Sequence, residues 1–434
     1  MAAFFYVWHN EQMVNFSSYF EAVRFLEGLI NIPAQDYLKD RSNPEIYIKR
    51  MRFLLNALGN PDRGMKYIHI SGTAGKGTVA NMVHSGLVAA GKKAGLFTSP
   101  FIISTIEKIK VGDLYISPQE FVSVVNKIKP VLDEVHEKSP YGSPSYFEII
   151  LAVAFIYFRK KKCEWVVLEV GLGGSFDATN VIERPRITAI TNIDRDHTHI
   201  LGKTLIKIAR DKGGIIKKDS LFLTTESRPH LTKIFQEICR RKKSDCEFIN
   251  VVSGYRDRNK ALAQAILERV GISLKYISRG ISNARMPGRF EIIDRNPLVI
   301  LDGAHSPVKI KGLIEDLGQI SFDNLYLIFG VANNKEYKEM IGLLLPLARK
   351  IFATRFEINE RKCAPPGDIK EVIKKISRKE VEVFLDPMMA LDKSLRIARK
   401  NDLILATGSL FLVSRLRRRW YPEEVFLKTR KAFK

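Results

Sequence analysis

The chain has 434 residues, roughly three times the size of a typical domain, so its length predicts two domains. Hydrophobic residues make up 45% and charged residues 27%, which excludes a wholly disordered or fibrous protein. Lysine and arginine number 70 against 47 aspartates and glutamates, and the resulting net charge of +23 raises nucleic acid or a polyanionic substrate as a possible partner.

The basic residues do not gather as they would in a nucleic-acid interface. None of their clusters is interleaved with aromatic residues in the manner of a base-stacking platform. Charge runs of this kind are more often solvated helix faces, so we expect no nucleic-acid partner. The clusters span residues 159–162, 240–243, 374–379 and 415–419.

We expect neither a membrane segment nor a secretion signal. No apolar run reaches the ~18 residues that span a bilayer, and residues 1–13 lack the basic region and clear cleavage site of a signal peptide. The four cysteines lack CxxC spacing and indicate neither a disulfide framework nor a zinc site. These observations favour a reduced, cytoplasmic protein.

Short β-branched segments alternate with helical patterns along most of the chain, which is typical of an α/β fold with a largely parallel sheet. The amphipathic segment 79–90 predicts a helix that ends at Gly91. The apolar segment 149–158 is interpreted as a buried helix because it is too short to span a membrane. The strands predicted in this part span residues 66–70, 95–98, 165–170 and 187–193.

After a polar stretch at residues 278–287 the alternation starts again, which predicts a second, smaller sheet. We therefore place a domain boundary near residue 284, giving domains over residues 1–283 and 284–434. The strands predicted for the second sheet span residues 298–301, 325–329, 350–353, 381–384 and 403–406.

A glycine-rich loop between a predicted strand and a predicted helix is the clearest local motif. In YIHISGTAGKGT, residues 67–78, three glycines let successive backbone N–H groups point toward phosphate oxygens. The following helix adds its positive N-terminal dipole. Lys76 would neutralise the β- and γ-phosphates, and Thr78 could face a metal ion.

The general phosphate-loop consensus GxxxxGK[ST] is not met. Ile70 replaces its first glycine, and Gly77 separates the lysine from Thr78. A glycine-rich turn with an incidental lysine is therefore an alternative interpretation. The strand–loop–helix context favours nucleotide binding.

Seven motifs in one order resemble the folylpolyglutamate synthase/dihydrofolate synthase family, a branch of the Mur ligase superfamily. The resemblance covers nearly the whole chain. The motifs are GTAGKGT at 72–78, TSP at 98–100, EVGLGGSFDATN at 169–180, DHTHILG at 196–202, ARDKGG at 209–214, PGRFE at 287–291 and DGAHSP at 302–307.

The resemblance implies an ATP-dependent ligase that joins L-glutamate to a reduced folate or to dihydropteroate through an acyl phosphate. It places the active site in a cleft between the domains. It implies a phosphate-loop ATP-binding domain over residues 1–283 and a smaller Rossmann-like glutamate ligase domain over residues 284–434. It also implies Mg²⁺ as cofactor and a monomer.

The family's functional positions carry over to named residues of this chain. The resemblance implies catalytic roles for Lys76, Lys212 and His305. The implied ATP contacts are Gly72, Thr73, Ala74, Gly75, Lys76, Gly77, Thr78, Asn259, Arg289 and Asp302. Taken singly, Arg289 could instead be a surface arginine after a Pro-Gly turn, and Asp302 a helix N-cap.

Ser99 and Glu169 supply oxygen ligands suited to Mg²⁺ at predicted strand ends. The resemblance adds His197 as a further ligand, although a hydrogen-bonded loop histidine is an alternative. It also implies that Lys212 is carbamylated, which would replace a positive charge near the metal with an oxygen ligand. The alternative is an ordinary lysine near a helix end.

The implied folate contacts are Ser145, Tyr146, Phe147, Glu148, Phe176, Asp177 and Ala178. Aromatic rings would stack on the flat pterin, and a carboxylate would accept its N–H groups. The alternative is a helix start with Phe147 in the core.

The chain departs from the family pattern at Phe101, Ser175 and Ser306, where the family commonly has histidine, a basic residue and asparagine. The resemblance implies that these three positions face the substrate, so the changes could alter which folate the protein uses. Two other functions stay open: another Mur-type amino-acid ligase, and a basic nucleic-acid-binding P-loop ATPase.

Overall fold

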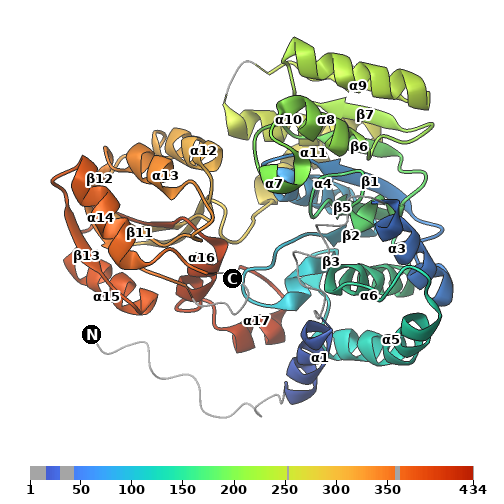
Figure 1. The fold of residues 1–434 in the computed structure, drawn as a ribbon, viewed down its shortest axis with the longest axis horizontal. Helices are drawn as coiled ribbons and strands as arrows, with labels where there is room; N and C mark the ends of the chain where they lie inside the picture. Colours follow the sequence, from blue (N-terminus) through green and yellow to red (C-terminus); the bar gives the residue numbers. More distant parts are fainter. Residues whose placement is uncertain (1–15, 30–43, 252–253, 357–361, 434) are drawn as a thin grey trace.

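The computed structural model describes residues 16–29, 44–251, 254–356 and 362–433. Residues 1–13, which concern the predicted lack of a signal peptide, lie outside the described residues. The two β-sheets form two bodies side by side, with the blue to yellow-green segments in one and the orange and red segments mainly in the other (Figure 1). The predicted α/β class with mostly parallel sheets is confirmed.

The first sheet has eight strands in the order β4-β3-β2-β5-β1-β6-β7-β8. Only β3 and β4 run antiparallel to their neighbours. The four predicted strands are confirmed as β1, β2, β5 and β6, whereas the other four, each of two to four residues, were not predicted. The strands are β1 (Lys66–Ser71), β2 (Ala94–Phe97), β3 (Ile109–Val111), β4 (Leu114–Tyr115), β5 (Trp165–Glu169), β6 (Ile187–Ile190), β7 (Leu221–Thr224) and β8 (Asp245–Phe248).

Both faces of the first sheet are covered. Alternate side chains of β5 point to opposite faces, so Val166 and Leu168 join one hydrophobic cluster while Trp165 and Val167 join another. The continuous apolar character of β1 and β5 follows from this burial on both faces. The elements outside the sheet are α1 (Ser17–Gly28), α3 (Glu45–Ala57), α4 (Lys76–Ala89), η1 (Thr105–Lys108), α5 (Pro118–Lys138), α6 (Tyr146–Lys160), η2 (Ala178–Val181), α7 (Thr198–Leu201), α8 (Leu205–Gly213), α9 (Pro229–Lys242), α10 (Tyr255–Arg269) and α11 (Leu274–Asn283).

Two helix predictions for this part of the chain are confirmed. Helix α4 ends at Ala89, and Gly91 follows with a φ of 75°, the left-handed conformation that ends many helices. Helix α6 is buried along most of its length, as the apolar segment 149–158 predicts. Among the residues that the structure describes, no helix is both long and apolar enough to cross a membrane.

The second sheet has six strands in the order β13-β12-β11-β14-β10-β9, and only the edge strand β9 is antiparallel. All five strands predicted for it are confirmed, whereas β9 was not predicted. Its strands are β9 (Glu291–Arg295), β10 (Leu298–Leu301), β11 (Leu325–Phe329), β12 (Ala348–Ala353), β13 (Glu380–Val383) and β14 (Leu403–Thr407). The helices are α12 (Pro307–Leu317), α13 (Tyr337–Leu344), α14 (Pro366–Ile376), α15 (Pro387–Ile397), α16 (Leu410–Arg417) and α17 (Glu423–Thr429).

Residues 284–290 form the linker between α11 and β9. A buried arginine joins the end of this linker and the start of β9 to the last described residues. The Arg417 guanidinium pairs with Glu291 at 2.8 Å and donates to the carbonyl of Ala432. Its carbon lies 4.2 Å from the centre of the Tyr421 ring. Glu291 also accepts the N–H of Gly288 at 2.8 Å. One side chain therefore fixes both the linker and the final segment.

That final segment packs on the first domain. Phe426 and Leu427 of α17 belong to the hydrophobic cluster that contains α6. Arg430 extends the contact, because Tyr115 N–H donates to its carbonyl at 3.2 Å and its Nε donates to the Tyr115 carbonyl at 2.7 Å. The domain predicted over 284–434 thus includes a segment whose side chains complete the first domain's core.

Helices α4 and α11 pack at very close range through glycine. A Cβ added to Gly280 would lie 2.4 Å from the Cα of Gly86, an overlap with backbone that no rotamer change relieves. We expect Gly280→Ala to lower the free energy of unfolding by about 1–3 kcal/mol or more, because the helices must separate. Urea denaturation measures the change.

The matched control is Gly342→Ala on α13, where an added Cβ meets nothing within 4 Å. This variant is expected to be neutral or stabilised by up to ~1 kcal/mol through helix propensity. Equal stability of the two variants would contradict the close packing of α4 on α11.

Candidate active site

The glycine-rich loop joins β1 to α4 and is shaped by contacts that exclude side chains. Gly75 has a φ of 80° and lies at the N-terminus of α4. A Cβ there would lie 2.5 Å from Oδ1 of Asn259 and 2.7 Å from the Tyr255 hydroxyl. Glycine is required on both counts. The same contacts place Asn259, a predicted ATP contact, directly against the loop.

The first part of the loop is held by residues that follow β6. Thr73 N–H donates to the Asn192 carbonyl at 2.9 Å, and Ala74 N–H donates to Asn192 Oδ1 at 2.9 Å. The Thr191 hydroxyl donates to the Ala74 carbonyl at 2.5 Å. Because these two loop N–H groups are engaged, Thr73 and Ala74 hold the loop in shape. The Gly77 N–H is directed at the Glu169 carboxylate, so an anion would meet the N–H groups of Gly75, Lys76 and Thr78 at the start of α4.

Two lysine side chains converge on one carbonyl of the loop. Lys76 Nζ donates to Gly72 O at 3.1 Å, and Lys212 Nζ donates to the same oxygen at 2.9 Å. Lys212 lies on α8 and is only 4% exposed. Burial, together with the charge of Lys76, lowers the pKa of Lys212 to about 7. The pair forms a positive site that an anion would stabilise.

A buried carboxylate lies over the first turn of α4. Glu169, at the end of β5, accepts the N–H of Ser99 at 3.0 Å. A Cβ on Gly77 would lie 3.0 Å from Oε2 of Glu169 and 2.6 Å from Cε of Met286. This crowding explains why glycine separates Lys76 from Thr78 in the loop.

Burial raises the pKa of Glu169, although the charges of Lys76 and Arg289 oppose the shift. A buried carboxylate beside the Ser99 backbone fits the hard oxygen ligands that Mg²⁺ prefers. Within the described residues, no three His, Cys, Asp or Glu side chains cluster so that they could hold a metal. A metal bound to Glu169 would therefore need ligands such as a hydroxyl, water or phosphate.

His197 lies at the start of α7 with a φ of 49°, and its Nε2 is 3.8 Å from Oδ1 of Asp196. Burial lowers the pKa of His197 to about 4, against the effect of Asp196. The imidazole is therefore neutral at pH 7, as a metal ligand must be. Its metal role stays a prediction.

In the second domain, Arg289 and Asp302 meet at Gly303. A Cβ on Gly303 would lie 2.9 Å from a terminal nitrogen of Arg289. Asp302 accepts the N–H groups of Phe290 at 2.7 Å and Ala304 at 2.8 Å, so its carboxylate holds the loop together. The alternative interpretation of Asp302 as a helix N-cap is wrong, because the residue before α12 is Ser306.

Sequence reasoning missed three charged residues that link the two domains near this site. Asp196, which follows β6, lies 3.4 Å from Lys309 on α12 and 3.7 Å from Lys335. Lys309 is also 3.0 Å from Nε2 of the predicted catalytic His305. His305 precedes α12 and is not part of the helix, so its four-residue spacing from Lys309 was a weak signal for that contact.

Two residues of the predicted folate-binding stretch at 145–148 have a structural role in α6. Ser145 is the N-cap of α6, and Glu148 completes its capping box. The fully buried Glu148 carboxylate also pairs with Arg50 at 3.0 Å. Both Glu148 oxygens accept from Arg50, so the carboxylate has a structural role, and the predicted contact of Glu148 with pterin N–H groups stays a prediction.

Two further predicted folate contacts, Phe147 and Asp177, lie close together. A Cβ on Gly171 would lie 2.8 Å from the Phe147 ring and 3.1 Å from Oδ2 of Asp177. Phe147 also lies edge-to-face with Phe97 at 5.7 Å. Phe176, beside Asp177, is 37% exposed. An aromatic ring and a carboxylate thus flank one glycine, and their contact with a pterin stays a prediction.

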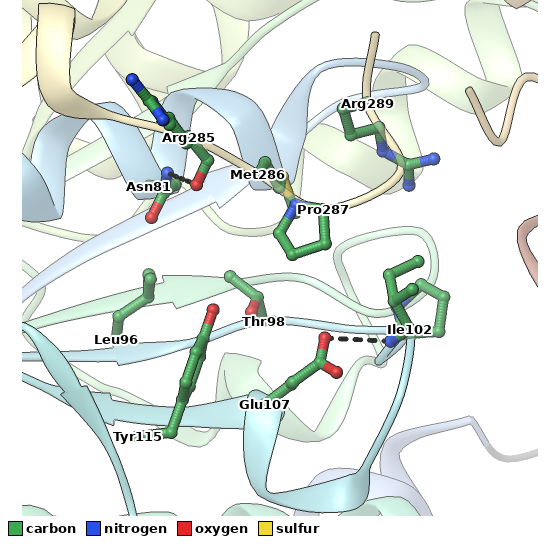
Figure 2. A pocket seen from close by; sticks show the side chains of 11 residues that line it. Asn81, Leu96, Thr98, Ile102, Glu107, Tyr115, Arg285, Met286, Pro287 and Arg289 are labelled. Carbon is green, nitrogen blue, oxygen red and sulfur yellow. Dashed lines mark hydrogen bonds between the residues drawn. The ribbon is translucent and has the colours of Figure 1, made fainter. Parts of the chain in front are cut away.

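A cavity of about 30 Å³, lined in part by Arg289, lies between the linker and the β2–β4 edge of the first sheet. Figure 2 shows Met286 and Pro287 facing Thr98, Glu107 and Tyr115 across it. Its volume is about that of one water molecule. We interpret it as a gap in the packing between the domains and not as a substrate site.

Comparison with protein families gives two matches. Residues 70–292 match the Mur ligase middle domain, and residues 288–410 match the Mur ligase glutamate ligase domain. Together the two models cover residues 70–410, from the end of β1 to the start of α16.

Two relatives match over 85% of this chain. The dihydrofolate synthase/folylpolyglutamate synthase of Bacillus subtilis is 31% identical over 410 residues, which cover 85% of this chain and 94% of that protein. The probable bifunctional folylpolyglutamate synthase/dihydropteroate synthase of Haloferax volcanii is 30% identical over 407 residues, which cover 85% of this chain and 48% of that protein. The chain thus spans about half the length of the second relative.

Solved structures share the fold. The folylpolyglutamate synthase of Thermotoga maritima is 30% identical with a TM-score of 0.78, and the match covers 96% of this chain and 98% of that one. The Mycobacterium tuberculosis folylpolyglutamate synthase complexed with ADP has a TM-score of 0.83 at 23% identity, covering 93% of this chain and 98% of that one, and shows the fold alone.

The structural role of Glu148 has a direct test. Replacing Glu148 by Gln leaves the Arg50 guanidinium without its buried counter-charge, and we expect a loss of about 3–5 kcal/mol in the free energy of unfolding. The control Glu45→Gln removes an exposed carboxylate 3.5 Å from Lys49 and is expected to change stability by less than about 0.5 kcal/mol. Denaturant titration compares them, and a Glu148→Gln protein as stable as the parent would contradict the assignment.

Proposed function

The chain belongs to the Mur ligase superfamily, in the folylpolyglutamate synthase/dihydrofolate synthase family, and from that premise we propose that it uses ATP to join L-glutamate to a folate carboxylate. The observation that carries the proposal is the convergence of Lys76 and Lys212 on Gly72 O, beneath the buried carboxylate of Glu169. Such a site suits a nucleotide phosphate with a bound cation.

The reaction needs activation because a carboxylate oxygen is a poor leaving group. Transfer of the γ-phosphoryl group from ATP to the folate carboxylate forms an acyl phosphate and releases ADP. The amine of L-glutamate loses a proton and attacks the acyl carbon, and phosphate leaves as the amide forms. Lys76 supplies positive charge where the phosphoryl group carries negative charge.

Mg²⁺ is the proposed cation, with Glu169, Ser99 and His197 as the residues that would hold it. When bound, it would neutralise phosphate charge and polarise the transferred group. The Yersinia pestis bifunctional folylpolyglutamate synthase/dihydrofolate synthase was solved with AMPPNP and a Mn ion, at 23% identity. Its likeness to this chain supports the fold.

Lys212 is the proposed site of carbamylation. A pKa of about 7 means that roughly half of its amines are neutral at pH 7, and only a neutral amine attacks carbon dioxide. Addition to carbon dioxide with loss of a proton would give an anionic carbamate. The change would remove one of the two positive charges at Gly72 O.

We propose Phe147, Phe176, Asp177 and Ala178 as the residues that contact the pterin of dihydropteroate or a reduced folate. Among the departures from the family pattern, Phe101 packs its ring 5.3 Å from the Lys108 ammonium. The Ser175 hydroxyl donates to the Asp211 carbonyl at 2.9 Å. Both are engaged in packing within the first domain.

ATP turnover with different additives tests the proposed function. We expect ADP formation that requires both L-glutamate and a folate, with dihydropteroate and tetrahydrofolate assayed separately. Turnover that instead requires DNA or RNA and falls steeply with salt would identify a nucleic-acid-dependent ATPase. Turnover with another amino acid and another carboxylate would identify a different Mur-type ligase.

Lys76→Ala is expected to lose at least ~10²-fold in ligase rate, comparable with removal of one preorganised charge-stabilising group. The fold should persist because glycines set the loop backbone. Lys92→Ala, an exposed lysine just beyond the other end of α4, is the control and should retain full rate. A well-folded Lys76→Ala protein with normal turnover would rule out the phosphate loop.

Lys212→Ala is expected to be inactive and to recover part of its activity with added short carboxylates, which can occupy the carbamate position. The exposed Lys218→Ala variant should keep its activity and be indifferent to carboxylates. Crystals of the active complex with an unmodified Lys212 would contradict carbamylation.

A further inference from the structure

A chain of polar contacts crosses from the first domain to the loop that carries His305. Lys309 Nζ lies 3.4 Å from Oδ2 of Asp196, and Lys335 Nζ lies 3.7 Å from Oδ1 of the same carboxylate. Asp196 comes from the first domain, whereas both lysines come from the second. The charges of the lysines hold the pKa of Asp196 below its ordinary value, although burial alone would raise it.

The contacts of His305 define its tautomer. Its Nδ1 lies 2.8 Å from the carbonyl oxygen of Gly303, which can only accept, so Nδ1 carries the hydrogen. Its Nε2 lies 3.0 Å from Nζ of Lys309, an ammonium that can only donate, so Nε2 offers its lone pair. Both ring nitrogens are thereby assigned from their partners.

The charges around this imidazole oppose a second proton. The cations that face it are Lys309 from α12, Lys335 from the loop after β11 and Arg289 from the linker, and the Asp196 carboxylate of the first domain also interacts with it. Burial and these cations lower the pKa of His305 well below its ordinary value. An imidazolium would place a positive N–H group directly against the Lys309 ammonium.

We infer that Lys309 is a positioning residue, which fixes His305 as the neutral Nδ1–H tautomer, and that Asp196 holds Lys309 in place across the domain boundary. Its link to catalysis rests on the proposed function. His305 is a predicted catalytic residue, and its protonation at low pH would replace its contact with Lys309 by a repulsion between two cations, so the acid limb of the pH profile reports loss of the neutral imidazole.

Titration of His305 by NMR tests the inference without any substrate. The chain has eight histidines, so the signal of ¹³C-labelled His305 is identified by its loss in His305→Gln. In the parent protein we expect no titration of this signal between pH 6 and 8. In Lys309→Met we expect its midpoint to rise toward the ordinary histidine value, about 6.5, by about one pH unit or more, because a unit charge about 3 Å away is gone.

Two further variants separate charge from hydrogen bonding. Lys309→Arg keeps a cation and should keep His305 neutral. Lys309→Gln keeps a hydrogen-bond donor without charge, so it should preserve the tautomer while the midpoint rises. The control Lys311→Met removes an exposed lysine of the same helix, 3.6 Å from Glu339, and should leave the titration unchanged. Thermal unfolding verifies that each variant folds.

The pH profile of kcat/KM supplies the second measurement. We expect the acid limb to move to higher pH in Lys309→Met and to return in Lys309→Arg. The inference is overturned if His305 in a folded Lys309→Met protein titrates as in the parent. If no folate ligase activity exists, the proposed function fails, but the NMR titration still decides the role of Lys309.

Discussion

The carbonyl oxygen of Gly72 accepts hydrogen bonds from two lysine ammonium groups, and the surrounding structure follows from that concentration of charge. Like charges at one oxygen repel, so the arrangement persists only with carboxylates nearby or with one amine neutral. Glu169 supplies negative charge from β5, and Asp196 supplies it beside the second domain. The lowered pKa of Lys212 reduces the repulsion further, because a neutral amine adds no positive charge beside Lys76.

Charge compensation also connects the two domains. Asp196 of the first domain contacts two lysines of the second, so part of the charge balance depends on the domains lying together. A ligand that brings phosphates and carboxylates changes that balance directly. Its negative charge would compete with Asp196 for Lys309 and Lys335 and would relieve the repulsion between Lys76 and Lys212. Binding and domain arrangement are therefore coupled through the same few charges.

Much of the fold could be predicted from the sequence because the central strands are apolar on both faces. The segments of β1, β5, β11 and β14 are continuous apolar runs, which predict buried strands without any knowledge of their neighbours. The missed strands β3 and β4 have three and two residues, too few for a period, and depend on pairing with neighbours. The missed strand β8 contains Asp245 and Glu247 and so lacks an apolar run, whereas β7 is as long and as apolar as predicted strands such as β2. The edge strand β9 alternates weakly and precedes a tight turn.

Some residues of the candidate site could likewise be predicted from the sequence, and others could not. The loop glycines and Glu169 sit at strand ends, where topology alone brings them together. The contact of Lys309 with Asp196 depends on how two domains pack, which no local spacing encodes. Glu148 is different, because Ser145 and Glu148 form the S-x-x-E pattern of a capping box before an apolar run. That pattern was readable and indicates a structural carboxylate.

The position of α17 has a consequence for synthesis of the chain. Phe426, Leu427 and Ala432 belong to the hydrophobic cluster of the first domain, together with residues of α1, α5 and α6. A ribosome that has translated the first 300 residues has therefore released a domain whose apolar surface is still uncovered. That surface stays open to chaperones or to other nascent chains until the second domain has emerged and α17 has docked. Although the two sheets are separate along the sequence, the first reaches its final packing last.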